Sequence, residues 1–557
     1  MAGATGAGKT SLLNALLGQE EFLPSSSQEA ATASICQIAW NHEDGPKKQF
    51  RGVVKYRTRK DIKNELDQIL GDLKVEASSP EDAPEAAPEA TGRDGEEDDG
   101  DGEDTAAGND LDELSADLDK ISRVWGLTAE ELEDMTSDDI LRVDHHANRL
   151  ITASAIEISA SDAETFSAEI QPYLDASKTV TPSGEQMEIW PLIDHVEVYL
   201  KAPILQNGVV LVDLPGLGDA VEDRASVAQR YYSELAVTAI LTPIVRAADE
   251  STAVSLLNDN QALSMEMDDK LNSRRFCVVA SKMDDISCSR YIKAAKCGEE
   301  LHKAKVAIQT LQPEVNKLNQ ELTVQERKIR DLKRLKREAF VNWKATRAKR
   351  DAASAPATAV DLAQQAKVAS KCLREQNKII YKLNTAKRIK EKKLAHARGN
   401  RRYQCISKRN VHVTKRIQVD FQRRNVRLSR RLAKKDGDLD IKVFPVSTYA
   451  FWTAKAEAEA AEYLEGFPSR NFSGVPHLAA WIREATLPAR KEHATRMLNK
   501  LLNLLNNVRT WSDEQCRGSK VLYSRDHIDM DVLQPFGVDV LRVSRGAVES
   551  DNRRVDL

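Results

Sequence analysis

The sequence lacks several features that would place it in a simple class. Seven cysteines occur among 557 residues, an odd number with no C-x-x-C pair, so neither a disulfide framework nor a cysteine-based metal site is indicated. No window holds the roughly 18 uncharged apolar residues that a membrane span needs, and no apolar leader follows Met1. Aromatic residues make up only 5% of the chain. These absences favour a reducing setting in the nucleus or cytoplasm, and any membrane contact would be peripheral.

Charge is abundant but unevenly placed. Charged residues make up 30% of the chain, with a net charge of -5. Acidic residues concentrate between about 79 and 138, whereas Lys and Arg concentrate between about 323 and 435. Dense like charge with little hydrophobicity cannot offset the entropy lost on ordering. We therefore expect a disordered acidic linker over about 76–137, and we favour a solvating linker over a mimic of nucleic acid.

Alternating strands and helices indicate an α/β domain with a mostly parallel sheet covered on both faces. A helix is expected over 9–17 and a strand over 35–40. Later, the runs at about 196–204 and 209–212 are expected to form adjacent strands, and further strands are expected at 239–245 and after Arg275. A chain of this length should contain several units. We expect one α/β domain in three parts (1–43, 189–286 and 436–490), an insertion (44–188), a helical arm (287–435), the start of a further helical segment (491–515) and a poorly ordered tail (516–557).

The expected arm is a long basic helical hairpin, bundle or coiled coil. A heptad pattern of apolar residues, interrupted at Gln325, favours packing of one helix against another. Pro313 is expected in the first turn of the main helix. A second helix is expected over about 360–396, and a third up to about 435. We favour solvated helix faces for the basic runs KRLKRE and KRIKEKK. The alternatives are nuclear import signals or surfaces for nucleic acid or an anionic membrane. The heptad residues are Ile308, Leu311, Val315, Leu318, Leu322, Ile329 and Leu332.

A phosphate-binding loop opens the chain, with the spacing Gly3-x-x-x-x-Gly8-Lys9-Thr10. Glycines, including Gly6, let successive backbone N–H groups turn toward phosphates. The Lys9 ammonium can reach the β- and γ-phosphate oxygens, and the Thr10 hydroxyl can ligate Mg²⁺. The following helix, which includes Ser11, directs its positive end at the same phosphates.

A second motif, Asp213-Leu214-Pro215-Gly216, ends an apolar strand. A plain turn is the alternative interpretation, since Asp, Pro and Gly are common turn residues. Together with the phosphate loop, however, it fits the DxxG motif of a GTPase. Asp213 would then hold Mg²⁺ through water, and the Gly216 N–H would meet the γ-phosphate.

A third motif, Ser281-Lys282-Met283-Asp284, also follows a strand and is similar to the [NT]KxD motif that binds guanine. Asp284 can accept hydrogen bonds from the guanine N1 and N2 hydrogens, and the stem of Lys282 can cover the ring. Serine in first place has less polar capacity than asparagine to hold the phosphate loop. We expect this to lower affinity more than specificity.

Two further residues are candidates by position. Thr32 lies between the first helix and the next strand, where a switch threonine would complete the Mg²⁺ site and position the attacking water. Ser447 follows the last strand, and its backbone would contact the guanine O6.

The motifs together resemble those of the dynamin-like large GTPases, most closely nuclear GTPases of the SLIP-GC type and their fungal relatives. The resemblance rests on GATGAGKTSLLNALLG, DLPGLGD, AILTPIVRAADESTA and VVASKMDDI. It implies a Ras-like G domain, a helical stalk and Mg²⁺-dependent GTP hydrolysis promoted by self-association. Leu217 follows Gly216 where Ras-type enzymes have a glutamine, a feature that this family shares, so backbone groups would position the water.

We therefore expect a GTPase in which Lys9, Thr32 and Gly216 act in catalysis. The alternative is a non-hydrolysing GTP-binding scaffold that acts through its basic arm. Because the phosphate loop begins at residue 3, the strand that normally precedes it is expected to be missing. We expect this to leave the protein marginally stable or inactive unless an upstream segment is restored.

Overall fold

The computed structural model describes most of the chain, in two compact units, Met1–Arg483 and Glu484–Leu557. All structural statements below concern the described residues: 1–3, 6–24, 34–77, 106–142, 145–175, 179–180, 186–215, 231, 235–248, 272–294, 299–348, 357–431, 441–454 and 464–512.

The first unit is built on a sheet with a fully parallel part. Its strands, in spatial order, are β1 (Ala2–Gly3), β9 (Thr238–Pro243), β10 (Phe276–Ser281) and β11 (Lys442–Pro445). All six residues of β10 are buried, as expected for a parallel strand covered on both faces. The expected mostly parallel α/β sheet is therefore present. The first strand was expected to be missing, but the two-residue strand β1 occupies its place. The expected effect on stability stays a prediction.

Hydrogen bonds of Met1 join this part of the sheet to β8 (Leu211–Asp213). The Leu214 N–H donates to Met1 O at 3.1 Å, and the Met1 amine donates to Val212 O. β1 therefore lies between β8 and β9. The other strands follow in the order β8, β2, β7, β3, β4. Their bounds are β2 (Cys36–Trp40), β7 (Ile193–Leu200), β3 (Phe50–Tyr56) and β4 (Ala155–Ala160).

The two adjacent strands expected at about 196–204 and 209–212 are present as β7 and β8, but they are not neighbours in the sheet. β7 and β8 are consecutive in the chain, but β2 lies between them, parallel to β7 and antiparallel to β8. The ten residues 201–210 that connect β7 and β8 are long enough to pass the end of one strand. Nearness in sequence therefore did not decide which strands pair.

The insertion after β2 is more ordered than its composition indicates. The expectation of disorder is wrong for 106–137, which contains α3 (Ala106–Trp125) and α4 (Ala129–Glu133); residues 78–105 lie outside the described chain. Ile121 and Val124 are buried, and α3 contacts α2, so tertiary packing outweighs the acidic composition. The remaining elements are α2 (Arg59–Ala77), α5 (Ser137–Arg142), α6 (His146–Ala153), α7 (Ala163–Leu174), β5 (Thr179–Val180), β6 (Gln186–Met187) and η1 (Trp190–Leu192).

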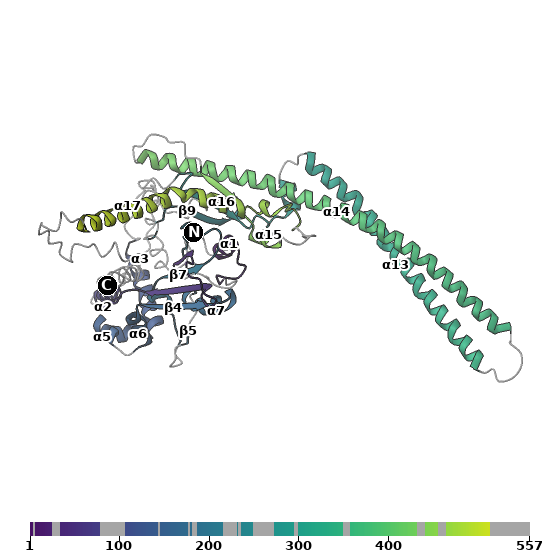
Figure 1. The fold of residues 1–557 in the computed structure, drawn as a ribbon, viewed down its shortest axis with the longest axis horizontal. Helices are drawn as coiled ribbons and strands as arrows, with labels where there is room; N and C mark the ends of the chain where they lie inside the picture. The colour runs from purple at the N-terminus through teal and green to yellow at the C-terminus, as the bar shows by residue number, and fades with distance from the viewer. Residues whose placement is uncertain are drawn as a thin grey trace, which may run out of the picture. The chain divides into compact units, whose positions relative to one another are not determined.

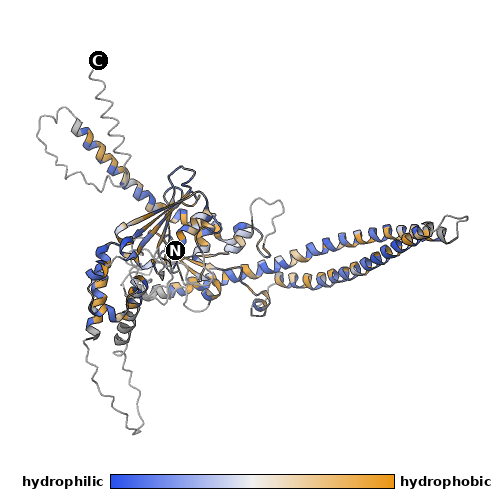
Figure 2. Cartoon of the chain, turned by 90° about the horizontal axis from the view of Figure 1, so that it is seen from below, coloured by the Kyte–Doolittle hydropathy of each residue, from blue (hydrophilic) through white to orange (hydrophobic). Residues whose placement is uncertain are grey.

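The arm is an antiparallel pair of long helices, α13 (Glu299–Ala348) and α14 (Ala357–Arg431) (Figure 1). Lys390 Nζ of α14 lies 3.0 Å from Glu314 Oε2 of α13. In α13 the heptad residues Val315, Leu322 and Ile329 are buried. Figure 2 shows apolar residues interspersed with hydrophilic ones along both helices.

Two expectations about the arm are wrong. Pro313 lies inside α13 rather than in its first turn; packing against α14 offsets the one backbone hydrogen bond that proline removes. The expected second and third helices are one continuous helix, α14. Gly399 does not end it, because a single helical glycine costs only about 1 kcal/mol, less than the packing on either side contributes.

The last part of α14 covers the sheet. Ile406, Val413 and Phe421 belong to one buried cluster with Phe276 of β10, and the Phe276 and Phe421 ring centroids lie 5.2 Å apart. Short elements complete this unit: α1 (Lys9–Leu17), α9 (Ile244–Ala248), α12 (Cys288–Ala294), α15 (Thr448–Thr453), η2 (Arg470–Ser473) and α16 (Val475–Ala485). The expected helix over 9–17 is confirmed.

The second unit contains α17 (Leu487–Ser512). Leu498, Leu502 and Leu505 of this helix are exposed. The expected poorly ordered tail lies outside the described residues. Among the residues that are described, no helix is both long and apolar enough to cross a membrane.

Candidate nucleotide-binding site

The phosphate loop connects β1 to α1, and its glycines have distinct roles. Gly6 and Gly8 have positive φ angles of 73° and 90°, a region that favours glycine. A Cβ at either would meet no atom within 4 Å, so the space beside both is open. Gly3 has a different constraint, because a Cβ there would lie 2.3 Å from Leu241 O of β9. The loop therefore needs glycine for its turns and for its contact with the sheet.

The side chains at the start of α1 are poised at this loop. Lys9 Nζ donates to Gly3 O at 3.2 Å and is buried, so the lysine links the two ends of the loop. Thr10 is buried and Ser11 partly buried, both in the first turn of α1. The amino end of α1, which carries partial positive charge, thus meets the loop together with the Lys9 ammonium.

Asp213 ends β8, is buried and lies on a strand that α1 contacts. The Thr10 hydroxyl and the Asp213 carboxylate are oxygen ligands of the kind that Mg²⁺ prefers. Together with the open space beside Gly6 and Gly8, this donor set fits a magnesium-bound phosphate chain. Thr32 and Gly216, the other expected members of this site, lie outside the described residues.

Ser281, at the end of β10, reaches the phosphate loop. Its Oγ donates to Ala7 O at 2.7 Å, and the residue is buried. The sequence suggested that serine would hold the loop less well than asparagine. In the structure the serine hydroxyl makes this contact directly, so the base motif and the phosphate loop are joined by a buried hydrogen bond.

The loop after Ser281, residues 282–285, carries Asp284 and is called the base loop below. Lys282 is exposed with a positive φ of 56°, and the Met283 N–H donates to Val446 O at 3.0 Å. The Ser447 hydroxyl donates to Asp284 Oδ1 at 2.5 Å. The loop is thereby fixed to the segment that follows β11.

The backbone contact of Ser447 with the guanine O6 stays a prediction. In the structure its backbone N–H donates to Ser473 O at 2.9 Å. The hydroxyl orients Asp284 and also accepts from the Ala450 N–H at 3.0 Å, which caps α15. The side chain of Ser447 therefore links Asp284 to the start of α15.

The sequence motifs did not identify two arginines that contact the base loop. Arg402 and Arg409 of α14 donate to backbone carbonyl groups of the base loop, including Asp284 O at 2.9 Å from Arg402 Nη2. Their spacing of seven places them on one helix face. Many other Lys and Arg residues of α14 share such spacing, so nothing in the sequence singles these two out.

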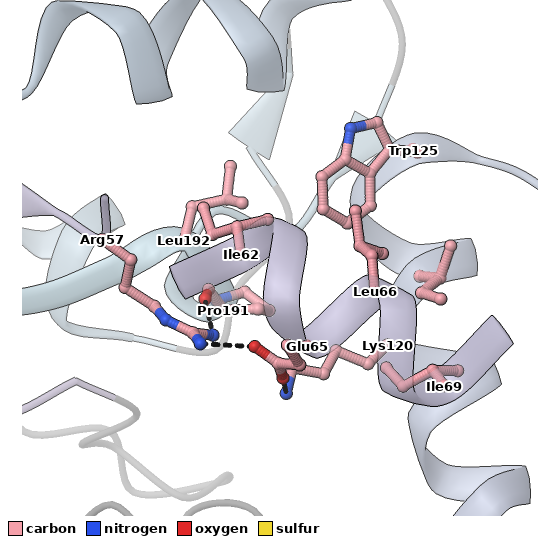
Figure 3. Close-up of a pocket in the computed structure, with 10 residues that line it drawn as sticks. Arg57, Ile62, Glu65, Leu66, Ile69, Lys120, Trp125, Pro191 and Leu192 are labelled. Atoms are coloured by element: carbon pink, nitrogen blue, oxygen red, sulfur yellow. Dashed lines mark hydrogen bonds and ion pairs between the residues drawn. The ribbon is translucent and has the colours of Figure 1, made fainter. Parts of the chain in front are cut away.

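A separate hollow lies between α2 and α3 and does not include any of these residues (Figure 3). Its polar side is occupied by Glu65, which forms ion pairs with Arg57 and Lys120. Burial opposes the charge of Glu65, but Lys120 and Arg57 outweigh it and hold the pKa of this carboxyl below its usual value. The cluster joins α2 to α3 and explains part of the order in the insertion.

Comparison with known proteins shows which family the chain is similar to. The model of the dynamin family matches residues 1–283. "Nuclear GTPase SLIP-GC" of Homo sapiens is 28% identical over 359 residues, which are 62% of this chain and 39% of the relative. The Mus musculus protein of the same name is 28% identical over 335 residues, 59% of this chain and 36% of the relative. The chain thus spans well under half the length of either relative.

Among solved structures, one similar chain comes from "An oligomerised bacterial dynamin pair provides a mechanism for the long range sensing and tethering of membranes". It is 14% identical, and the match covers 98% of this chain and 74% of that chain with a TM-score of 0.26. A similarity this low carries no argument about function.

Proposed function

Because the chain belongs to the dynamin family, whose model matches residues 1–283, we propose that it binds GTP with Mg²⁺ and hydrolyses it to GDP and phosphate. One observation carries the proposal. The Ser281 hydroxyl donates to Ala7 O at 2.7 Å, so a motif with the chemistry of guanine recognition and a phosphate loop form a single site. A nucleotide bound there would contact both.

The residues have separable roles in this proposal. Lys9 neutralises charge on the β- and γ-phosphates, and backbone N–H groups of the loop bind phosphate oxygens. Thr10 and Asp213 would hold Mg²⁺, which supplies further charge neutralisation on the transferred phosphoryl group. Asp284 accepts from the guanine N1 and N2 hydrogens. Thr32 and Gly216 stay predictions for the positioning of the attacking water and the γ-phosphate, since Leu217 replaces the glutamine of Ras-type enzymes.

The test is nucleotide binding and turnover by the purified chain. We expect GTP to bind more tightly than ATP, and phosphate release to disappear in Lys9→Ala. Asp284→Ala should remove the preference for GTP over ATP, whereas Asp361→Ala, an exposed acidic residue on α14, serves as the matched control. Equal affinity for ATP and GTP in the wild type would refute the guanine assignment.

We further propose nucleotide-dependent self-association, as the family resemblance implies. Sedimentation of the chain with GDP and with a non-hydrolysable GTP analogue tests it. A larger species is expected only with the triphosphate analogue, and the same sedimentation coefficient in both states would contradict the proposal.

A second candidate is a non-hydrolysing scaffold that acts through the arm. Lys333, Arg334, Lys336 and Arg337 of α13 are all exposed, which suits a surface for nucleic acid or an anionic membrane. The relatives named as nuclear GTPases support a nuclear location. Guanine nucleotide binding without turnover above background, together with salt-dependent binding of duplex DNA that a fourfold Ala variant loses, would favour this candidate.

A further inference from the structure

Three consecutive carbonyl groups of the base loop are bound by two arginines from the arm. Arg402 Nη2 donates to Asp284 O at 2.9 Å. Arg409 donates to the carbonyls on either side, through Nη1 to Asp285 O at 2.6 Å and through Nη2 to Met283 O. The planar guanidinium fork suits such a two-pronged contact. The peptide units on both sides of the Asp284 side chain are thereby held by α14.

The contact lies where the loop enters the buried core, since both arginines are partly buried. Met283 is 1% exposed and belongs to one buried cluster with Ile406 and Val413 of α14. Asn410, next to Arg409, places its Nδ2 3.4 Å from Met283 Sδ. Burial lowers the pKa of Arg409, and the carboxylates of Asp285 and Asp284 oppose that shift.

The side chain of Arg402 is held in place by close packing against Gly466. Gly466 has a φ of 89°, and a Cβ there would lie 2.8 Å from Arg402 Cγ. The absence of a side chain at 466 therefore leaves room for the arginine stem. The Ser447 hydroxyl approaches the same aspartate from the other direction and donates to Oδ1 at 2.5 Å.

We propose that Arg402 and Arg409 are positioning residues for guanine recognition, which couple α14 to the orientation of the Asp284 carboxylate. This rests on the proposed function, because it assumes that Asp284 binds the base. In this role the arginines act through the loop backbone, whose carbonyl groups they bind. Their loss should therefore impair discrimination at the base while the phosphate contacts remain.

Diphosphates give the sharpest test, because they bind without turnover. IDP has the same base as GDP without the 2-amino group, so the ratio of the IDP and GDP dissociation constants reports the contact of Asp284 with that group. An inactive fraction of protein changes both apparent affinities equally and cancels in the ratio. A variant that merely folds less well therefore leaves the ratio unchanged.

In the full chain we expect the IDP/GDP ratio to fall by about tenfold in Arg409→Ala and by less in Arg409→Lys, whose single ammonium cannot reproduce the fork. The ratio for Arg402→Ala should lie between the ratios for these two variants. Arg423→Ala is the matched control, since this exposed arginine of α14 pairs with Asp420 of the same helix, 3.6 Å away.

The outcomes separate this inference from the proposed function. A wild type that binds ADP as tightly as GDP refutes guanine recognition itself. A wild type that prefers GDP to ADP, with a wild-type IDP/GDP ratio in Arg402→Ala and Arg409→Ala, overturns only the positioning role. A reduced ratio in these two variants and an unchanged ratio in Arg423→Ala supports it.

Discussion

At the scale of single residues, Gly3 is constrained by space rather than by its backbone angles. A Cβ there would lie 2.3 Å from Leu241 O, so Gly3→Ala must displace β1 from β9. We expect the free energy of unfolding to fall by roughly 1–3 kcal/mol, the usual cost of overpacking, as measured by thermal unfolding. Gly71→Ala is the control: a Cβ there meets nothing within 4 Å in α2, and the change should stabilise by about 0.5–1 kcal/mol. Equal effects would contradict the steric argument.

Ser281 gives a second prediction at this scale. Ser281→Ala leaves the buried Ala7 carbonyl without this donor, and a hydrogen bond of this kind contributes about 1 kcal/mol. GDP affinity should fall about fivefold by titration calorimetry while the IDP/GDP ratio stays constant, because Asp284 is not displaced. The exposed Ser289→Ala on α12 should change neither quantity. A changed ratio in Ser281→Ala would show that the serine orients the base loop instead.

His195 on β7 gives a pH dependence. Its hydrogen bond to Asp194, 2.6 Å from Nδ1 to Oδ2, raises the pKa of His195; burial and Lys55 oppose this rise, and Glu197 adds to it. Because the folded pKa lies above the unfolded value of about 6.5, this stabilisation is full below that pH. It is lost as pH rises through the folded pKa. Urea titrations at pH values from below about 6.5 to above the folded pKa should show this loss of unfolding free energy in the wild type and not in His195→Gln. Parallel dependence of stability on pH in the two proteins would disprove the contribution of His195.

At the scale of elements, α13 carries a polar residue in its apolar stripe. Gln325 occupies a heptad position, and among the described residues its buried Oε1 has no hydrogen-bond partner. Gln325→Leu should therefore raise the stability of the helical pair by roughly 1–2 kcal/mol, seen as slower hydrogen exchange in α13 and α14. Gln320 is exposed, so no buried polar atom is removed by Gln320→Leu, and this control should have little effect. Destabilisation by Gln325→Leu would mean that the glutamine makes a contact that the apolar side chain cannot.

At the scale of the whole molecule, nucleotide binding should stabilise the unit Met1–Arg483, because its site joins β1, β8, β10, α1 and α14. At a GDP concentration of 100 times Kd, linkage gives about 2.7 kcal/mol of added stability. The expected result is a higher melting temperature in scanning calorimetry, absent in Lys9→Ala. An equal shift in that variant would place the ligand elsewhere.

The sequence alone was enough for the local elements of the site. Motif spacing and short apolar runs are local properties. They were enough to predict helix α1, the strand ends that carry Asp213 and Ser281, and the glycines of the phosphate loop. The heptad pattern of α13 likewise identified the residues that are shielded in the hairpin. Family membership also followed from the order of the motifs.

Only the tertiary structure decided how these parts connect. Contacts between residues distant in sequence decided four features. They are the insertion of β2 between β7 and β8, the folding of α3 as a helix, the continuity of α14 past Gly399, and the contacts of Ser447, Arg402 and Arg409. Such contacts depend on burial and on which polar groups still need a partner after packing. The sequence therefore determined which chemical groups are present and on which local elements, and the packing determined which of them hold the site in place.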